Sequence, residues 1–292
     1  MRAIVTVAMV KELRSITGAG IMACKKALQT TNGNIEAAIR ELRKAGEETV
    51  SKLSGKKTGE GIIVIAISDD SKKGYMVEIN CQTDFVARNE EFIAFAQNVA
   101  ERGLIEKTTD VAITPTFYQT GLSTTLEKTR QGLIAKFGEN IQIRRMKLLS
   151  VDSGIIGHYS HGSRIGVLVA LDSDKDKLGL AKDIAMHIAA FNPQAIRASD
   201  VPIEAVEKEK EILIAQAKEI GKSKDITTKI VEGRLNKFLK EISLEGQFFI
   251  KNPEILVGNL LKSEKITITA FVRFKVGESI EQDSENFVNE FR

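Results

Sequence analysis

The chain has 292 residues, a length typical of about two domains. Lysine and arginine number 42 and aspartate and glutamate number 39, so the formal net charge is +3. That balance is too even for a protein whose main task is to neutralise nucleic-acid phosphates. No apolar run approaches the ~18 residues that a membrane span requires, so composition predicts a soluble globular protein.

The N-terminus and the cysteines bear on the cellular compartment. Residues 1–10 carry one arginine and a short apolar run without a small-residue cleavage site, which predicts the lead-in to a helix and not a signal peptide. The two cysteines, Cys24 and Cys81, lie far apart, which fits a reducing cytoplasm and excludes a cysteine-based metal cluster. We expect a cytoplasmic protein without a cofactor or a metal.

Residues 1–54 are predicted to form a module of three short helices. Gly18 and Gly20 favour a turn after the first helix, and the pair Asn32-Gly33 ends the second. The third helix has one apolar face, formed by Ile35, Ala38, Ile39 and Leu42. The lysine- and glycine-rich stretch 51–60 is predicted to be a linker.

Residues 55–150 are predicted to form the first half of an α+β core. Apolar residues alternate at 63–67 and at 77–81 around a polar turn, which predicts an antiparallel hairpin. Two helices follow, with apolar faces formed by Phe92, Phe95, Ala96 and Val99 and by Leu122, Leu126, Leu133 and Phe137. A returning strand then begins at Ile141.

The order of hairpin, helix and returning strand recurs later in the chain, which predicts a second, related core subdomain in residues 151–195 and 246–276. Its predicted elements are a hairpin at 154–159 and 165–171, a helix around 181–188 and a strand at 266–276. Strands mixed with helices in this way indicate the α+β class with antiparallel sheets.

Residues 196–245 interrupt the second copy and are predicted to form an antiparallel coiled-coil hairpin. The expected seam residues are Val206, Leu213 and Ile220 on one helix and Val231, Leu235, Phe238 and Ile242 on the other, with a break at 221–225. Each seam has one partner helix, so the outer faces are available to another protein or to a second copy of the chain. Residues 277–292 are assigned to a C-terminal module.

Motifs typical of enzymes are missing from the sequence. It has no phosphate-binding loop of the GxxxxGKS or GxxxxGKT type, no GxSxG nucleophile elbow and no HExxH metal motif. His158 and His161 lie near each other without a third ligand. Both cysteines are predicted to be core residues, and His187 a hydrogen-bonded core or interface residue. We therefore expect a binding protein and not an enzyme.

The segment 80–92 joins the first hairpin to the first core helix and carries the strongest functional signal. Asp84 or Asn89 could cap that helix, but Phe85 lies outside the apolar pattern of both elements. Phe85 either folds back as a hydrophobic staple or projects and wedges into a partner. The corresponding turn of the second copy, 171–175, has no aromatic residue, so the architecture does not require one.

The run from Cys81 to Asn89, CQTDFVARN, resembles the signature of the bacterial elongation factor Ts family. Further similar motifs lie at 10–14, 17–20, 24–28, 138–145, 161–168, 184–190 and 231–234. Together they cover essentially the whole chain in a fixed order. The resemblance implies a ubiquitin-associated-like N-terminal module, two related core subdomains and a coiled-coil hairpin used in dimerisation or partner contact.

The resemblance also implies guanine nucleotide exchange on elongation factor Tu, without catalytic chemistry. The segment implied to dislodge the magnesium ion bound with GDP is Thr83, Asp84, Phe85 and Val86, with Phe85 entering between helices of the partner's nucleotide domain. The other implied partner contacts are Arg14, Ile21, Met22, Phe137 and His161, with a further contact in 278–292. Phe137 departs from the smaller aliphatic residue expected in the family.

The residues alone leave a second function open, namely RNA or ribosome binding through the basic run 144–147 and the lysine-rich hairpin. Those charges also fit a solvated face. A steep loss of binding with salt would favour RNA, and a weak salt dependence with a protein partner would favour exchange. We expect elongation factor Tu as partner, homodimer formation through the hairpin as an open alternative, and neither direct nucleic-acid nor membrane binding.

Overall fold

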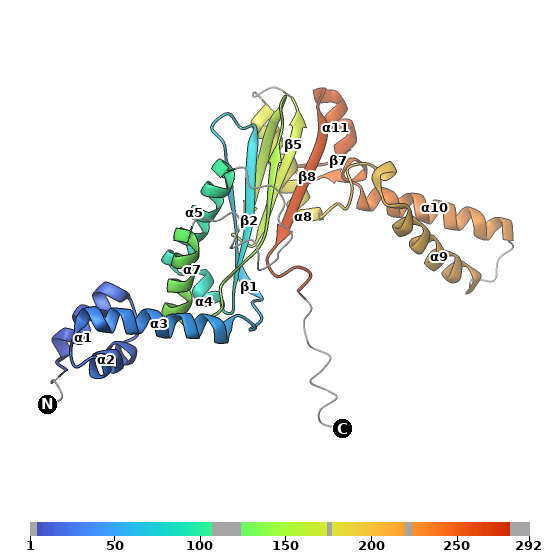
Figure 1. The fold of residues 1–292 in the computed structure, drawn as a ribbon. Helices are drawn as coiled ribbons and strands as arrows, with labels where there is room; N and C mark the ends of the chain where they lie inside the picture. The colour runs from blue at the N-terminus through green and yellow to red at the C-terminus, as the bar shows by residue number, and fades with distance from the viewer. Residues whose placement is uncertain (1–4, 107–123, 174–176, 220–223, 281–292) are drawn as a thin grey trace. The chain divides into compact units, whose positions relative to one another are not determined.

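The computed structural model describes residues 5–106, 124–173, 177–219 and 224–280 (Figure 1). Helices combine with sheets that include antiparallel strand pairs, so the predicted α+β class is confirmed. The described residues divide into two compact units, one within 1–64, 77–147 and 275–292 and the other within 65–76 and 148–274. The predicted division of the chain into five domains stays a prediction. No helix in the described ranges combines the length and the apolar character needed to cross a membrane.

The N-terminal helices are α1 (Val7–Thr17), α2 (Ile21–Thr30) and α3 (Ile35–Leu53). Gly18 ends α1 with a φ of +67°, a left-handed conformation that glycine adopts at little cost. Asn34 begins α3, where its side chain accepts the Ala37 N–H at 2.9 Å. The three helices bury a small core of Leu13, Cys24, Ala27, Leu28 and Ala38. The three predicted helices are therefore confirmed.

Helix α3 continues to Leu53, so the prediction that a linker begins at residue 51 is wrong. Its later turns pack against α7 (Thr124–Phe137). A Cβ added at Gly46 would lie 3.3 Å from the Ala135 Cβ, which shows how closely the two helices approach. The helix thus continues through a polar stretch, where it is packed against a helix that is distant in sequence.

The first sheet has the order β1 (Glu60–Ile67), β2 (Lys73–Cys81), β3 (Gln142–Ser150). The predicted first hairpin and returning strand are thus confirmed. Figure 1 shows α5 (Glu90–Glu106) and α7 beside this sheet. Phe92, Phe95, Ala96 and Val99 of α5 are all buried, as predicted, whereas Leu122 lies outside the described residues. A short helix, α4 (Asp84–Ala87), precedes α5.

The second sheet has the order β4 (Ile155–His161), β5 (Ile165–Asp172), β8 (Thr267–Lys275). Strands β4 and β5 pair antiparallel, with Ile155 opposite Leu171, which confirms the second predicted hairpin. Helix α8 (Leu178–Phe191) packs on both strands. A Cβ added at Gly157 would lie 2.5 Å from the Ala181 Cβ, so glycine permits this close helix–sheet approach.

The predicted helical hairpin consists of α9 (Ile203–Glu219) and α10 (Lys224–Ile242). Its buried seam contains Leu213, Ala217 and Val231, with Ile214 and Leu235 packed beside it. Leu213, Val231 and Leu235 were predicted, Ala217 was not, and Ile220 lies outside the described residues. The remaining elements are η2 (Ala198–Asp200), η3 (Leu244–Gly246), β6 (Phe248–Phe249), β7 (Asn252–Leu256) and α11 (Val257–Glu264).

His187 of α8 is a buried core residue, as predicted. The Ile250 N–H donates to its Nδ1 (3.2 Å), so the ring proton lies on Nε2 and donates to the Gln247 Oε1 (3.0 Å). Gln247 in turn donates to the Glu241 carbonyl (2.6 Å), and the His187 ring stacks on Phe191. Burial lowers the pKa of His187 below its ordinary 6.5, and the bond to Gln247 opposes that shift in part.

This lowered pKa predicts that stability falls as the solution is acidified. Below about pH 6.5 the unfolded chain takes up a proton that the folded imidazole resists, so acidification favours unfolding. The pKa of His158 is also lowered, by desolvation and then by Lys182, but its side chain is exposed, so its effect of the same sign is smaller. Between about pH 7.5 and about pH 5.5, the free energy of unfolding of His187→Asn should fall by less than that of the unsubstituted chain, as measured by urea unfolding. An equal fall in unfolding free energy for the two proteins would contradict the role of His187 in the loss of stability at acidic pH.

Candidate functional site

The chain between β2 and α5, residues 82–89, forms a capped turn that we call the β2–α5 corner. Thr83 is the N-cap of α4, and its Oγ1 accepts the Val86 N–H at 3.5 Å. Asn89 begins α5, where its Oδ1 accepts the Glu91 N–H at 2.9 Å. Each of the two helices thus begins at a residue whose polar side chain satisfies a free backbone N–H.

Phe85 projects from this corner into solvent. Its exposed fraction is 83%, the highest among the exposed large hydrophobic residues of the described chain. The two residues that follow, Val86 and Ala87, are each only 6% exposed and anchor α4. The hydrophobic-staple alternative is therefore wrong, because the ring projects into solvent. That Phe85 wedges into a partner stays a prediction. Aromatic side chains are enriched among the residues that dominate interface energetics, so this exposed ring is a candidate binding anchor.

The carboxylate of Glu139 holds the start of the corner. Its Oε2 accepts the backbone N–H groups of Gln82 (3.1 Å) and Thr83 (3.0 Å), and its Oε1 accepts the Thr83 hydroxyl (2.6 Å). In return, the Gln82 Oε1 accepts the Asn140 N–H at 3.1 Å. Hydrogen bonds in both directions thus connect residues 82–83 with residues 139–140, which lie more than fifty positions away in the sequence.

Cys81 supports the corner from within. Its thiol is fully buried and donates to the Thr83 carbonyl oxygen at 3.1 Å. Burial raises the pKa of the thiol to about 12, and the negative charges of Glu139 and Glu60 add to the shift. The thiol is therefore protonated at neutral pH and is not a nucleophile, which confirms the prediction of a buried small hydrophobe.

The four residues of the predicted insertion segment differ in exposure. Asp84 forms an ion pair with Arg88 one turn away (3.0 Å); the Arg88 side chain is largely exposed and that of Asp84 about half exposed. Such surface pairs add little stability, so the Asp84 carboxylate remains available to a partner. Thr83 is half-buried and Val86 is buried. The corner therefore presents Asp84 and Phe85 outward and uses Thr83 and Val86 to hold them.

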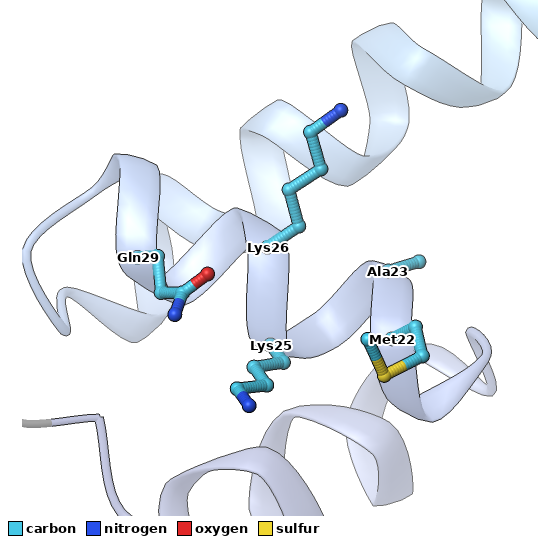
Figure 2. A pocket seen from close by; sticks show the side chains of 5 residues that line it. All are labelled: Met22, Ala23, Lys25, Lys26 and Gln29. Atoms are coloured by element: carbon cyan, nitrogen blue, oxygen red, sulfur yellow. The ribbon is translucent and has the colours of Figure 1, made fainter.

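Three other predicted contact residues lie in the N-terminal helices. Arg14 of α1 is exposed, and Ile21 and Met22 at the start of α2 are 54% and 73% exposed. A pocket of about 470 Å³ lies on α2. It is lined by Met22, Ala23, Lys25, Lys26 and Gln29 (Figure 2). This surface combines apolar contact area with positive charge.

The last two predicted contact residues lie in different compact units. Phe137 ends α7 and is half-buried, directly before Gly138, whose φ is +70°. It shares a unit with Phe85. His161 ends β4 in the other unit and is exposed, with its Nδ1 3.3 Å from the Tyr159 hydroxyl.

Comparison with known proteins decides the family. A family model described as elongation factor TS matches residues 82–278, about two thirds of the chain. The chain belongs to the elongation factor Ts family. Two proteins named elongation factor Ts are similar to this chain: one from Coxiella burnetii is 58% identical to it over 287 residues, and one from Legionella pneumophila is 49% identical over 292 residues. The alignments cover 98% of this chain in both cases, and 96% and 97% of the relatives.

In this member of the elongation factor Ts family, the two arginines of the basic run 144–147 form ion pairs inside their compact unit. Arg144 Nη1 lies 3.0 and 3.1 Å from the two carboxylate oxygens of the fully buried Glu78, and Arg145 Nε donates at 2.6 Å. The Gly277 N–H also donates to Glu78 (2.9 Å), and Arg145 reaches Glu278 (3.3 Å). Both guanidinium groups are therefore paired with a buried carboxylate and are mostly shielded from solvent.

Sequence reasoning did not single out Glu139 or Glu78, although the structure makes both central to this unit of the elongation factor Ts fold. Glu78 had a usable signal, because it interrupts an apolar run in β2 whose residues are buried on both sides. Glu139 had a weaker one: a lone acid between a glycine that ends a helix and the strand that follows is usually a solvated loop residue.

Proposed function

We propose that this chain accelerates the release of GDP from elongation factor Tu and thereby its exchange for GTP in translation. Membership in the elongation factor Ts family supports the partner. The observation that carries the proposal is Phe85, which is 83% exposed on a corner whose other residues are capped, paired or buried. The chain itself would make and break no covalent bond in this role.

Exchange requires only a difference in binding free energy. A factor that binds the nucleotide-free partner more tightly than the GDP-bound one must weaken GDP binding by the same factor. Each ~1.4 kcal/mol of that difference is tenfold in affinity. A buried aromatic anchor supplies about 2 kcal/mol or more, and the pre-formed β2–α5 corner reduces the entropy lost on binding.

The proposed mechanism also includes displacement of magnesium by residues 83–86. The magnesium ion bound with GDP neutralises its phosphates, so moving the ion weakens the electrostatic hold on the nucleotide. Insertion of Phe85 would shift the partner's segments that hold the ion. The neighbouring Asp84 carboxylate, about half exposed, supports a contact at the same place.

The experiment that tests this proposal is GDP release from purified elongation factor Tu. The partner is loaded with fluorescent GDP, and release is followed in excess unlabelled GDP with and without this chain. We expect a marked acceleration with magnesium present and a smaller one after chelation, since chelation already removes the ion. No acceleration in either condition would contradict the proposed function.

RNA binding receives less support from the described residues. Arg144 and Arg145, two of the three basic residues of the run 144–147, are paired with Glu78, so this alternative rests mainly on the lysine-rich hairpin. A complex with elongation factor Tu that depends weakly on salt would agree with exchange. Tight RNA binding that falls steeply with salt would favour the alternative.

A further inference from the structure

We propose that Glu139 is a positioning residue for exchange, which holds the β2–α5 corner in the geometry that presents Phe85. The inference rests on the proposed function and assigns Glu139 no contact with the partner. It starts from the three hydrogen bonds that one carboxylate accepts from Gln82 and Thr83, at 3.1, 3.0 and 2.6 Å.

The position of these bonds gives the carboxylate its importance. Strand β2 ends at Cys81 and α4 begins at Asp84. Gln82 and Thr83 lie between these two elements, and their N–H groups donate to the Glu139 Oε2. Hydrogen bonds to an ionised acceptor are roughly twice as strong as neutral ones. Without the carboxylate, both amides and the Thr83 hydroxyl lose that acceptor.

The effect reaches Phe85 through Thr83. The same Thr83 hydroxyl that donates to Glu139 accepts the Val86 N–H and caps α4. Helix α4 has only four residues, so it is too short to be stable without its cap and its buried anchors. Phe85 contributes little of its own to this stability because its ring is exposed. The direction in which the ring points is therefore set by the residues around it.

Glu139 is itself held in place by the end of α7. Gly138 takes a φ of +70°, and its N–H donates to the Ile134 carbonyl at 2.9 Å. Asn140, on the other side, donates its side-chain amide to the Lys56 carbonyl (2.8 Å). The carboxylate thus extends from a fixed point of the fold toward the corner, as a positioning role requires.

The test compares Glu139→Ala and Glu139→Gln with Phe85→Ala and the Glu139→Ala/Phe85→Ala double variant. We expect Glu139→Ala to slow stimulated GDP release roughly tenfold, because small displacements of a positioned group have large effects on rate. Glu139→Gln should recover part of the rate, since its amide oxygen can still accept both backbone N–H groups. In the Phe85→Ala background the same Glu139 change should cost less than about twofold.

Two further measurements separate positioning from general stability. Amide hydrogen exchange at Gln82 and Thr83 should speed up in Glu139→Ala, while exchange in β2 and α5 and the unfolding midpoint change little. Glu101→Ala, an exposed acid on α5, is the matched control and should alter neither rate nor exchange. Glu139→Gln keeps the test usable if the alanine variant does not fold.

The outcomes are distinct for the inference and for the proposed function. A normal release rate in Glu139→Ala, unchanged exchange at Gln82 and Thr83, or an equal loss in both Phe85 backgrounds would overturn the positioning role alone. Failure of the unsubstituted chain to accelerate release would overturn the proposed function, and the positioning role with it.

Discussion

Replacing Phe85 with alanine is expected to slow stimulated GDP release from elongation factor Tu by about tenfold or more. The ring is the exposed anchor of the β2–α5 corner, and an aromatic anchor is worth about 2 kcal/mol or more when it is buried in a partner. Because each ~1.4 kcal/mol corresponds to tenfold, the loss should exceed one order of magnitude. The measurement is the rate of GDP release at saturating concentrations of the variant.

The same substitution should leave the fold unchanged. Phe85 is 83% exposed and contributes little to any core, so the unfolding midpoint should shift by no more than that of a typical surface substitution. Phe248→Ala is a suitable control, because it removes a ring that is 58% exposed in the other compact unit. A release rate that stays normal in Phe85→Ala would contradict insertion as the mechanism.

Replacing Glu78 with alanine is expected to destabilise its compact unit by about 3 kcal/mol or more, the usual cost of removing one partner from a buried ion pair. The Glu78 side chain is fully buried and accepts bonds from Arg144 and Arg145, which are both mostly buried. Its loss leaves two positive charges close together and frees the Gly277 N–H from its acceptor. Urea unfolding followed by circular dichroism measures the change.

Glu241→Ala provides the matched control for this large effect. Glu241 also pairs with a cation, Lys237 at 3.7 Å, but both side chains are mostly exposed and the pair lies along one helix face. Exposed pairs of this kind contribute about 0.5 kcal/mol or less. If the two glutamate substitutions changed the unfolding free energy equally, the buried cluster would not be the stabilising feature described here.

The secondary structure followed from local patterns because each pattern records one element's own buried face. The alternation at 63–67 and 77–81 predicted β1 and β2, and the glycines at 18 and 20 predicted the turn between α1 and α2. Phe85 was recognisable for the opposite reason, since it fits neither neighbouring pattern. Ala217 was missed because a small side chain gives a weak apolar signal even at a close helix contact.

The contacts that hold the candidate site could not be read in this way. Glu139 lies 56 residues from Thr83, and Glu78 lies 66 residues from Arg144 and 199 from Gly277. Hydrogen bonds act over about 3 Å, so their partners depend on which distant segments the fold brings together. Amino-acid order by itself determined most of the helices, strands and turns, and it marked Phe85 as an aromatic outside both neighbouring patterns without deciding whether its ring faces solvent. Only the tertiary structure decided which acid meets which donors, because periodicity encodes a face of an element and not the identity of its neighbour.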